Sequence, residues 1–219
     1  MQLNNITNKE LISFFSKLES NAGFIDKLKI RYRPLICPFA HLLSFADGKE
    51  NAFDIGCGSG QFAMLLANYT SVQSIHGIEI DERLIGNANE LSKQFNSKKN
   101  LFFTVFDGKT IPDSISEAEV VYLIDVFHHV PKNQQEEFIL EVHKKMNSGA
   151  ILIFKDINAS SPLVLVNKLH DLIFAGEIGN EIGFKEAEKR LVKVGFDVVD
   201  AFTKLIFLYP HYFVICRKV

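Results

Sequence analysis

The first 49 residues carry apolar side chains at helical spacing. Between residues 11 and 18 they stand at positions i, i+3, i+4 and i+7, which predicts an amphipathic helix. Shorter apolar groups predict a second helix from about residue 24 and a third from about residue 39, the latter ending near Asp47-Gly48. We therefore expect residues 1–49 to form a helical cap.

From residue 50 onward, apolar runs alternate with amphipathic segments. Five runs are short and continuous, as expected for parallel strands that are covered on both faces. The segments between them place apolar residues on one helical face, and the last helix of the series has Pro131 in its first turn, where proline is tolerated. This alternation predicts a mostly parallel sheet with helices on both faces. The expected strands cover residues 52–55, 74–80, 101–105, 120–124 and 150–154.

The last quarter of the chain follows a different order. A helix capped by Ser161-Pro162 and a second helix over residues 184–194 precede two strand patterns, at 196–202 and 212–217. No helical pattern separates those two strands, so we expect an antiparallel hairpin at one sheet edge. The whole pattern predicts an α/β fold with a seven-stranded, mostly parallel sheet that closes with this hairpin.

Length and composition fit one globular domain with a proper core. The chain has 219 residues, of which 47% are hydrophobic and 23% charged. Its net charge of −2 disfavours a nucleic-acid partner, because neutralising phosphates usually requires a strong basic excess. We expect this domain to consist of the cap (1–49), a core (50–156), a lid or helical insertion (157–195) and the closing hairpin (196–219).

Cysteine usage and hydropathy bear on the compartment. The three cysteines are too few and too widely separated for a disulfide framework or a zinc site, so we expect a reducing cytoplasm and no metal. No segment approaches the roughly 20 uninterrupted apolar residues that span a bilayer, so we expect no stable membrane insertion. No pattern in the chain indicates an oligomeric state.

The sharpest motif is a glycine turn, DIGCGSG at residues 54–60, which directly follows the first expected strand. Three glycines at alternate positions let the backbone turn tightly and approach a ligand without a Cβ in between. The helix that follows offers unpaired N–H groups to a carboxylate or a phosphate. A nicotinamide-dinucleotide fingerprint requires the spacing G-x-G-x-x-G, but residue 61 is glutamine. A nicotinamide-dependent oxidoreductase is therefore the weaker alternative.

This turn resembles the first motif of the class I S-adenosylmethionine (SAM)-dependent methyltransferases, which has the form acidic-x-Gly-x-Gly-x-Gly. The resemblance continues with acidic residues at the end of the second strand (Glu79) and after the third (Asp107). After the fourth strand, DVFHHVP at residues 125–131 is close to the D-x-x-H-H segment of the family's small-molecule branch. Residues 147–150 depart from the family, with Asn-Ser-Gly-Ala in place of Lys-Pro-Gly-Gly. The similarity covers roughly residues 50–156, and it implies a Rossmann-like fold and SAM as the cofactor.

The resemblance implies a role for each of these positions. The backbone of the glycine turn would pass under the methionine part of SAM, and Asp54 would help to hold its ammonium group. Glu79 would accept hydrogen bonds from both ribose hydroxyls, unless it is only an exposed carboxylate at a strand end. Asp107 would bind the adenine amino group, unless Asp107-Gly108 is only a turn pair, and Phe106 or Ile80 would flank the ring. The expected cofactor-binding residues are Asp54, Gly56, Cys57, Gly58, Gly60, Glu79, Ile80, Phe106, Asp107, Gly108 and Asp125.

Candidate acceptor-side groups follow the fourth and fifth expected strands. His128 and His129 come after the fourth, and Lys155 and Asp156 after the fifth. Histidine is the natural general base, because its unperturbed pKa is about 6.5. We expect one of the two histidines to be catalytic; the other interpretation is that the pair only lines the cofactor pocket or caps the next helix. In the cap, Arg33 either reaches the SAM carboxylate or is a solvated arginine.

These motifs favour a SAM-dependent methyltransferase that acts on a small-molecule or lipid-like acceptor. Contacts to the acceptor are expected from the segment 158–181, where an apolar helical stripe accompanies a polar position at His170-Asp171; the alternative is that this segment only covers a face of the sheet. The main alternative is a SAM-binding regulatory or partner module without methyl transfer. Neither the acceptor nor the atom that receives the methyl group can be read from the sequence.

Overall fold

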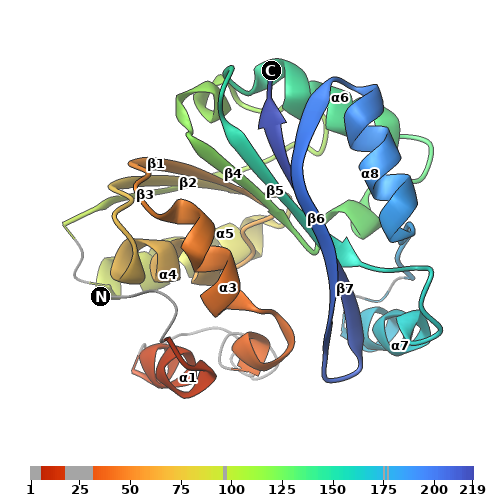
Figure 1. Ribbon diagram of the computed structural model, residues 1–219. Helices are drawn as coiled ribbons and strands as arrows, with labels where there is room; N and C mark the ends of the chain where they lie inside the picture. The colour runs from red at the N-terminus through yellow and green to blue at the C-terminus, as the bar shows by residue number, and fades with distance from the viewer. Residues whose placement is uncertain (1–5, 18–31, 96–97, 175, 177) are drawn as a thin grey trace. The chain divides into compact units, whose positions relative to one another are not determined.

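The computed structural model describes residues 6–17, 32–95, 98–174, 176 and 178–219. Its strands form one seven-stranded sheet in the order β3-β2-β1-β4-β5-β7-β6 (Figure 1). The predicted fold, a seven-stranded and mostly parallel sheet with an antiparallel C-terminal hairpin, is confirmed. The strands are β1 (Asn51–Ile55), β2 (Ser74–Glu79), β3 (Asn100–Val105), β4 (Val120–Ile124), β5 (Ile151–Ile157), β6 (Phe196–Ile206) and β7 (Tyr209–Lys218).

Helices account for most of the remaining described residues. None of those described combines the length and the hydropathy that crossing a bilayer requires. The helix predicted from about residue 24 lies outside the described residues. The helical elements are α1 (Asn8–Ser16), α3 (Phe39–Leu43), η2 (Ser44–Ala46), α4 (Gln61–Tyr69), α5 (Glu82–Gln94), η3 (Asp113–Glu117), η4 (Phe127–His129), α6 (Gln135–Lys145), α7 (Val164–Phe174) and α8 (Phe184–Lys193).

The chain divides into two compact units, and the first comprises residues 1–108 and 118–120. Its strands β1, β2 and β3 pair in parallel, with Asp54 opposite Gly77 on β2. Helices α4 and α5 pack against β2 and β3. Helix α4 is apolar and buried over residues 61–67, whereas α5 is amphipathic and begins after Asp81, which caps the helix by accepting a 2.8 Å hydrogen bond from the Arg83 N–H. The carboxyl ends of these parallel strands therefore meet where the glycine turn leaves β1.

The second unit comprises residues 109–117 and 121–219. Strand β7 runs antiparallel to both β5 and β6, and Asp156 on β5 lies opposite Tyr212 on β7. Helix α8 packs on β6 and β7, and α7 also contacts β7. All residues of β4 are buried, as its continuous apolar sequence predicted. The acceptor-side candidates leave β4 through η4 and lie in this unit.

Several element boundaries differ from the sequence-based expectation: β6 and β7 are longer than expected, and three other differences concern candidate site residues or the helix after them. Strand β5 continues to Ile157, so Lys155 and Asp156 belong to the strand and are buried instead of following it. Helix α6 begins at Gln135, because residues 131–134 form a turn that the Gln134 N–H closes on the Pro131 carbonyl at 2.7 Å. Pro131 therefore precedes the helix. Strand β2 ends at Glu79, which leaves Ile80 outside the sheet.

Candidate functional site

The glycine turn between β1 and α4 depends on backbone conformations that glycine favours. Gly56, Gly58 and Gly60 have φ angles of +75°, +55° and +74°, all in the left-handed region. A Cβ on Gly60 would also stand 2.8 Å from the ring of Phe103. The N–H groups of Gly56 and Cys57 both donate to the Ile78 carbonyl, at 2.8 and 3.0 Å. The turn is thus fixed to the end of β2.

The carboxylate of Glu79 ties the end of β2 to this turn. Its Oε2 accepts a hydrogen bond from the Gly58 N–H at 3.1 Å, and its Oε1 accepts from the N–H groups of Ile80 and Asp81 at 2.8 and 3.2 Å. The side chain is half-buried and held by three backbone donors, which differs from a freely exposed carboxylate at a strand end. The structure therefore brings Glu79 directly to the glycine turn.

Asp54 is a buried carboxyl beneath the same turn. Among the described residues its Oδ2 has no hydrogen-bond partner, although the residue is only 3% exposed. Burial raises the pKa of Asp54 to about 7; the charge of Arg33 lowers it, and the charge of Glu79 raises it further. A buried carboxyl oxygen without a partner is costly, and a ligand with a positive charge or a hydrogen-bond donor would relieve that cost.

Arg33 stands close to the glycine turn. Its guanidinium lies 5.9 Å from the centre of the Phe39 ring, and its Nη1 is 4.0 Å from the position that a Cβ on Gly58 would occupy. The structure thus favours the interpretation in which Arg33 belongs to the site over that of a solvated arginine. A carboxyl group and a guanidinium on the same glycine turn match the ammonium and the carboxylate of an amino-acid ligand.

Cys57 contributes its backbone to the turn. Burial raises the pKa of its thiol, and the charges of Asp54 and Glu79 raise it further, so the reactive thiolate is disfavoured. A Cβ on Gly77 would stand 2.8 Å from the Sγ of Cys57, so glycine at residue 77 leaves room for this side chain. These contacts agree with a structural side chain and a ligand-facing backbone.

The adenine-side candidates lie next to Glu79 along the chain and across the sheet. The Phe106 N–H donates to the Glu79 carbonyl at 2.8 Å, which fixes the loop after β3 beside the end of β2. Phe106 is buried, whereas Asp107 and Gly108 are exposed and Ile80 is 65% exposed. The structure therefore brings all four residues to the same strand ends, with the polar Asp107 accessible.

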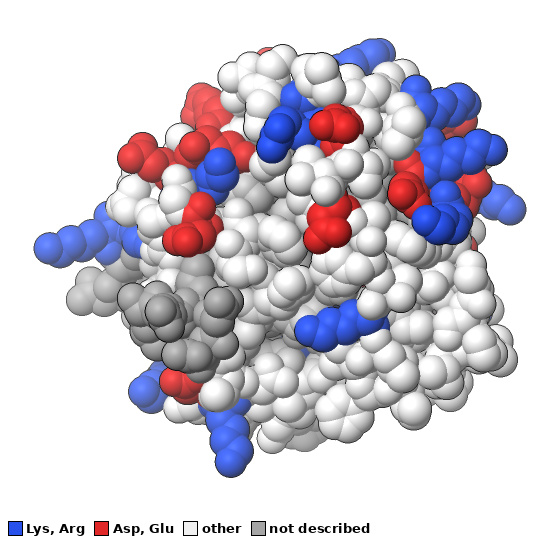
Figure 2. Space-filling view, viewed as in Figure 1, with Lys and Arg blue, Asp and Glu red and all other residues white. Residues whose placement is uncertain are grey.

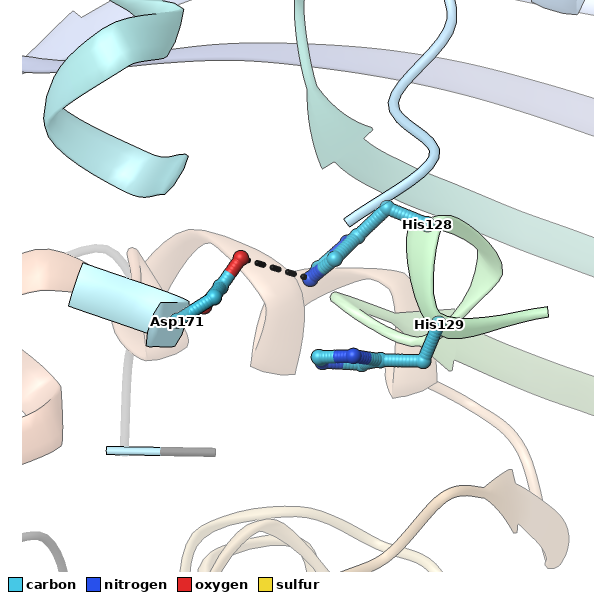
Figure 3. Close-up of side chains that lie close together, drawn as sticks. All are labelled: His128, His129 and Asp171. Atoms are coloured by element: carbon cyan, nitrogen blue, oxygen red, sulfur yellow. Dashed lines mark ion pairs between the residues drawn. The ribbon is translucent and has the colours of Figure 1, made fainter. Parts of the chain in front are cut away.

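The acceptor-side candidates form a separate cluster in the second unit. His128 is buried, and its Nδ1 lies 2.5 Å from Asp156 Oδ1, while its backbone N–H donates to Asp156 Oδ2 at 3.0 Å. Its Nε2 faces Asp171 Oδ2 of α7 at 3.5 Å, and the ring of His129 is centred 4.0 Å away (Figure 3). Burial lowers the pKa of His128, but the charges of Asp156, Asp125 and Asp171 and the hydrogen bond to Asp156 raise it to about 9.

Lys155, which is buried, and Asp125, which is half-buried, form an ion pair in the same unit. Lys155 Nζ lies 2.5 Å from Asp125 Oδ1, and the Lys155 side chain is fully buried. Asp125 has a φ of +55°, in the left-handed region that residues other than glycine seldom adopt. Residues held in this conformation occur preferentially at functional sites. Strand β5 can continue through Lys155 and Asp156 because each has a partner: Lys155 pairs with Asp125, and Asp156 pairs with His128.

Sequence reasoning missed most of the polar groups that α7 brings to His128. Asn167 Nδ2 donates to Asp171 Oδ2 at 2.6 Å and to Glu181 Oε1 at 3.1 Å. The Asn180 N–H donates to the His128 carbonyl at 2.6 Å. Asn167 and Asp171 stand at i and i+4 in α7, which also carries Lys168 and His170, and this spacing was the one available signal. The segment after β5 is thus bonded to the histidines through its polar side.

The predicted site residues therefore lie in two groups, one in each unit. The group in the second unit consists of Asp125, His128 and His129. The group in the first unit consists of Asp54, Gly56, Cys57, Gly58, Gly60, Glu79, Ile80, Phe106, Asp107 and Gly108.

Comparison with known proteins adds two curated relatives. A sterol 24-C-methyltransferase from Pneumocystis carinii is 26% identical over 161 residues, which are 68% of this chain and 40% of that protein. A tRNA (guanine-N(7)-)-methyltransferase from Prochlorococcus marinus (strain MIT 9215) is 28% identical over 125 residues, 51% of this chain and 59% of that protein. The chain thus spans less than two thirds of the length of either relative.

Solved structures share the fold over nearly the whole chain. The magnesium protoporphyrin IX methyltransferase of Synechocystis PCC 6803, solved with bound S-adenosylhomocysteine (SAH), superimposes with a TM-score of 0.68 at 17% identity. The similarity covers 98% of this chain and 96% of that one. The chain also matches the methyltransferase-domain family over residues 28–201. It therefore belongs to the methyltransferase-domain family and has the fold of the class I SAM-dependent methyltransferases.

Proposed function

We propose that the chain transfers the sulfonium methyl group of SAM to a small-molecule or lipid-like acceptor. The observation that carries this proposal is the glycine turn, whose Gly58 N–H bonds to Glu79 while the unpartnered Asp54 oxygen lies beneath it. Membership of the methyltransferase-domain family supports the same reaction. The cytoplasmic location remains a prediction.

The first unit carries groups suited to each part of SAM. Asp54 would hold the ammonium group and Arg33 the carboxylate, because each offers the opposite charge. Glu79 would accept hydrogen bonds from the ribose hydroxyls, and Asp107 from the adenine amino group. These assignments rest on the chemistry of the residues and on their common position around the turn.

The transfer itself is an in-line displacement. A lone pair of the acceptor forms the new bond to the methyl carbon, and the electrons of the carbon–sulfur bond go to sulfur, leaving SAH. Alignment of the reactants can lower the barrier by about 7–11 kcal/mol. An acceptor that arrives protonated must also lose a proton, and we assign the group that promotes this loss to the pair His128 and His129. The bonds between Asp156 and His128 support the assignment, because they fix its ring with Nε2 directed at α7. Since the pKa of His128 is raised to about 9, this ring accepts a proton most effectively in alkaline solution.

The surroundings of the histidine pair favour a small or lipid-like acceptor. Helix α7 exposes Leu165, Leu169 and Leu172, while its Asp171 lies at the histidines. On the face shown in Figure 2, basic side chains over α8 lie among acidic ones, as in the Arg190–Glu186 pair, and do not form a basic stripe. With a net charge of −2, this supports the expectation that the acceptor is not a nucleic acid, although several relatives are tRNA (guanine-N(7)-)-methyltransferases.

Calorimetry followed by a methyl-release assay tests the proposed function. We expect SAM and SAH to bind with one-to-one stoichiometry and NAD not to bind. Methyl release is then measured with small hydroxylated compounds, lipid-like alcohols, amines and unmodified tRNA. Transfer to a small or lipid-like compound supports the proposal, and transfer to tRNA alone would overturn its acceptor class. Tight SAM binding without transfer to any acceptor would favour the regulatory module.

A further inference from the structure

Three side chains of types that commonly bind metal ions lie close together in the second unit. His128 and His129 come from η4, and Asp171 comes from α7, 42 positions later in the chain. Each offers one ligand atom, and the three atoms lie within 4.8 Å of one another. Figure 3 shows both imidazole rings and the Asp171 carboxylate directed toward a common region.

Each ring nitrogen of His128 faces a carboxylate, and the two distances differ. On the Nδ1 side, Asp156 Oδ1 lies 2.5 Å away, which is a strong hydrogen bond. On the Nε2 side, Asp171 Oδ2 lies 3.5 Å away, which is beyond a good N–H···O bond. Two ligands of a tetrahedral zinc ion, each bonded at about 2.0–2.1 Å, stand about 3.3 Å apart. The Nε2–Asp171 separation therefore matches two ligands of one cation better than it matches a direct hydrogen bond.

The groups behind the three ligands also fit a metal site. A ligating histidine usually donates its other ring N–H to a carboxylate, which fixes the tautomer that leaves the ligating nitrogen free. Asp156 stands in this position for His128. Asp171 Oδ2 accepts a bond from Asn167 at 2.6 Å, which orients the carboxylate as hydrogen bonds to ligating carboxylates do in known metal sites. His129 is half-buried, which leaves its side chain room to rotate. Such a rotation can bring its ring nitrogen to bonding distance of a cation that His128 and Asp171 also bind.

We propose that His128, His129 and Asp171 form a binding site for a divalent first-row transition-metal cation of the zinc type. Two imidazoles and one carboxylate suit such a cation and leave at least one coordination position for an exchangeable ligand. The negative charges of Asp171 and Asp156 balance that of the cation. The three residues lie within one unit, so the site needs nothing from the other.

The cation would give the histidine pair a defined part in methyl transfer, and this consequence rests on the proposed function. An acceptor hydroxyl bound through its oxygen at the open position would become more acidic and would release its proton to water. The oxygen lone pair then forms the bond to the methyl carbon as the carbon–sulfur electron pair moves to sulfur. The site therefore favours acceptors that present a hydroxyl or a similar oxygen ligand.

Metal titration of the full chain tests the site without SAM or acceptor. The protein is dialysed against a chelator and then titrated with ZnCl2 by calorimetry, and with Co2+ by visible absorption. We expect one equivalent to bind, with the Co2+ spectrum of a four- or five-coordinate site. His129→Ala and Asp171→Asn should each weaken binding by at least about 100-fold, and Asp156→Asn by about 10–100-fold.

His143→Ala is the matched control, because His143 lies on α6, its ring packs edge-on against Phe196, and it is not one of the three ligands. It should bind Zn2+ as the wild type does. Equal affinity in the wild type and His129→Ala, or no saturable binding by the wild type, would overturn the metal site. SAM affinity, measured on the same samples, separates the two proposals: intact SAM binding with no metal site leaves the methyltransferase proposal standing.

Discussion

Glu79 Oε2 accepts a hydrogen bond from the Gly58 N–H at 3.1 Å, which joins the end of β2 to the middle of the glycine turn. The two residues are 21 positions apart, and the parallel pairing of β1 with β2 brings them together. The carboxylate therefore has two effects: it positions the turn in the unliganded chain, and it presents an acceptor to any ligand that lies on the turn.

Replacing Glu79 should separate these two effects. Glu79→Ala should weaken SAM binding by about 2–4 kcal/mol, because both ribose hydroxyls lose a charged acceptor. It should also lower the free energy of unfolding, because three backbone N–H groups lose their partner. Glu79→Gln keeps one acceptor oxygen, so its SAM affinity and its free energy of unfolding should lie between those of the wild type and Glu79→Ala. Calorimetry with SAM and urea unfolding measure the two quantities, with Glu82→Gln as the control; unchanged SAM affinity in Glu79→Ala would contradict the ribose assignment.

Ligand-induced stabilisation distinguishes the cofactor classes. SAM and SAH should raise the melting temperature in a concentration-dependent manner, because a ligand that binds only the folded state stabilises it by mass action. NAD should leave it unchanged. Differential scanning fluorimetry at several concentrations of each compound is sufficient, and stabilisation by NAD without stabilisation by SAM or SAH would contradict the cofactor assignment.

Asp54 should make stability depend on pH. Its pKa is raised from 3.8 to about 7 in the folded chain, so the folded state holds the proton more tightly than the unfolded state. The tighter proton binding contributes fully to the free energy of unfolding below about pH 4. This contribution is lost as the pH rises through 7, and the free energy of unfolding falls by at most about 4 kcal/mol. Asp54→Asn mimics the neutral form and should remove this dependence.

Two measurements check the prediction for Asp54. In urea unfolding, Asp54→Asn should be more stable than the wild type at pH 8 and similar to it at pH 4. SAM affinity should show the reverse, because the ammonium of SAM needs the ionised carboxylate, so the variant should bind SAM more weakly at pH 8. Asp47→Asn, at an exposed position, is the control. Equal stability profiles in Asp54→Asn and the wild type would show that burial does not perturb Asp54.

Sequence patterning predicted the fold of the molecule and the position of the glycine turn after β1. Periodicity located each β-strand, because apolar strands and amphipathic helices bury different faces. The glycine turn was also readable, since only glycine favours its three left-handed positions. Lys155 and Asp156 were misplaced because buried charges resemble a strand end until their partners are known. The contacts of Asp171 with His128 could not be predicted, since they join residues 43 positions apart through a segment without a recognisable motif.

Two glycines that differ in surroundings test the account of the turn. Gly60→Ala should lower the free energy of unfolding by about 1–3 kcal/mol, because its φ is +74° and the new Cβ would stand 2.8 Å from Phe103. Gly86→Ala should raise it by about 0.5–1 kcal/mol, because residue 86 lies in α5 with open space around it. Thermal and urea unfolding of both variants give opposite signs if the turn has the conformation described.

The histidine variants test whether the pair acts on the acceptor or on the cofactor. His128→Gln and His129→Ala should bind SAM nearly as the wild type does, while turnover falls about 10²–10⁴-fold, because the acceptor can no longer lose its proton efficiently. If the pair only lines the cofactor pocket, SAM affinity should fall in both variants and turnover at saturating SAM should be preserved. One SAM titration and one initial-rate series per variant distinguish these outcomes.

Chelator-treated wild type adds a third comparison: it should lose turnover while keeping SAM affinity, and Zn2+ should restore its rate but not that of His129→Ala. Full activity after chelation would leave proton transfer to the imidazoles themselves as the role of the pair, whereas full activity in both variants would assign the rate to alignment of the acceptor.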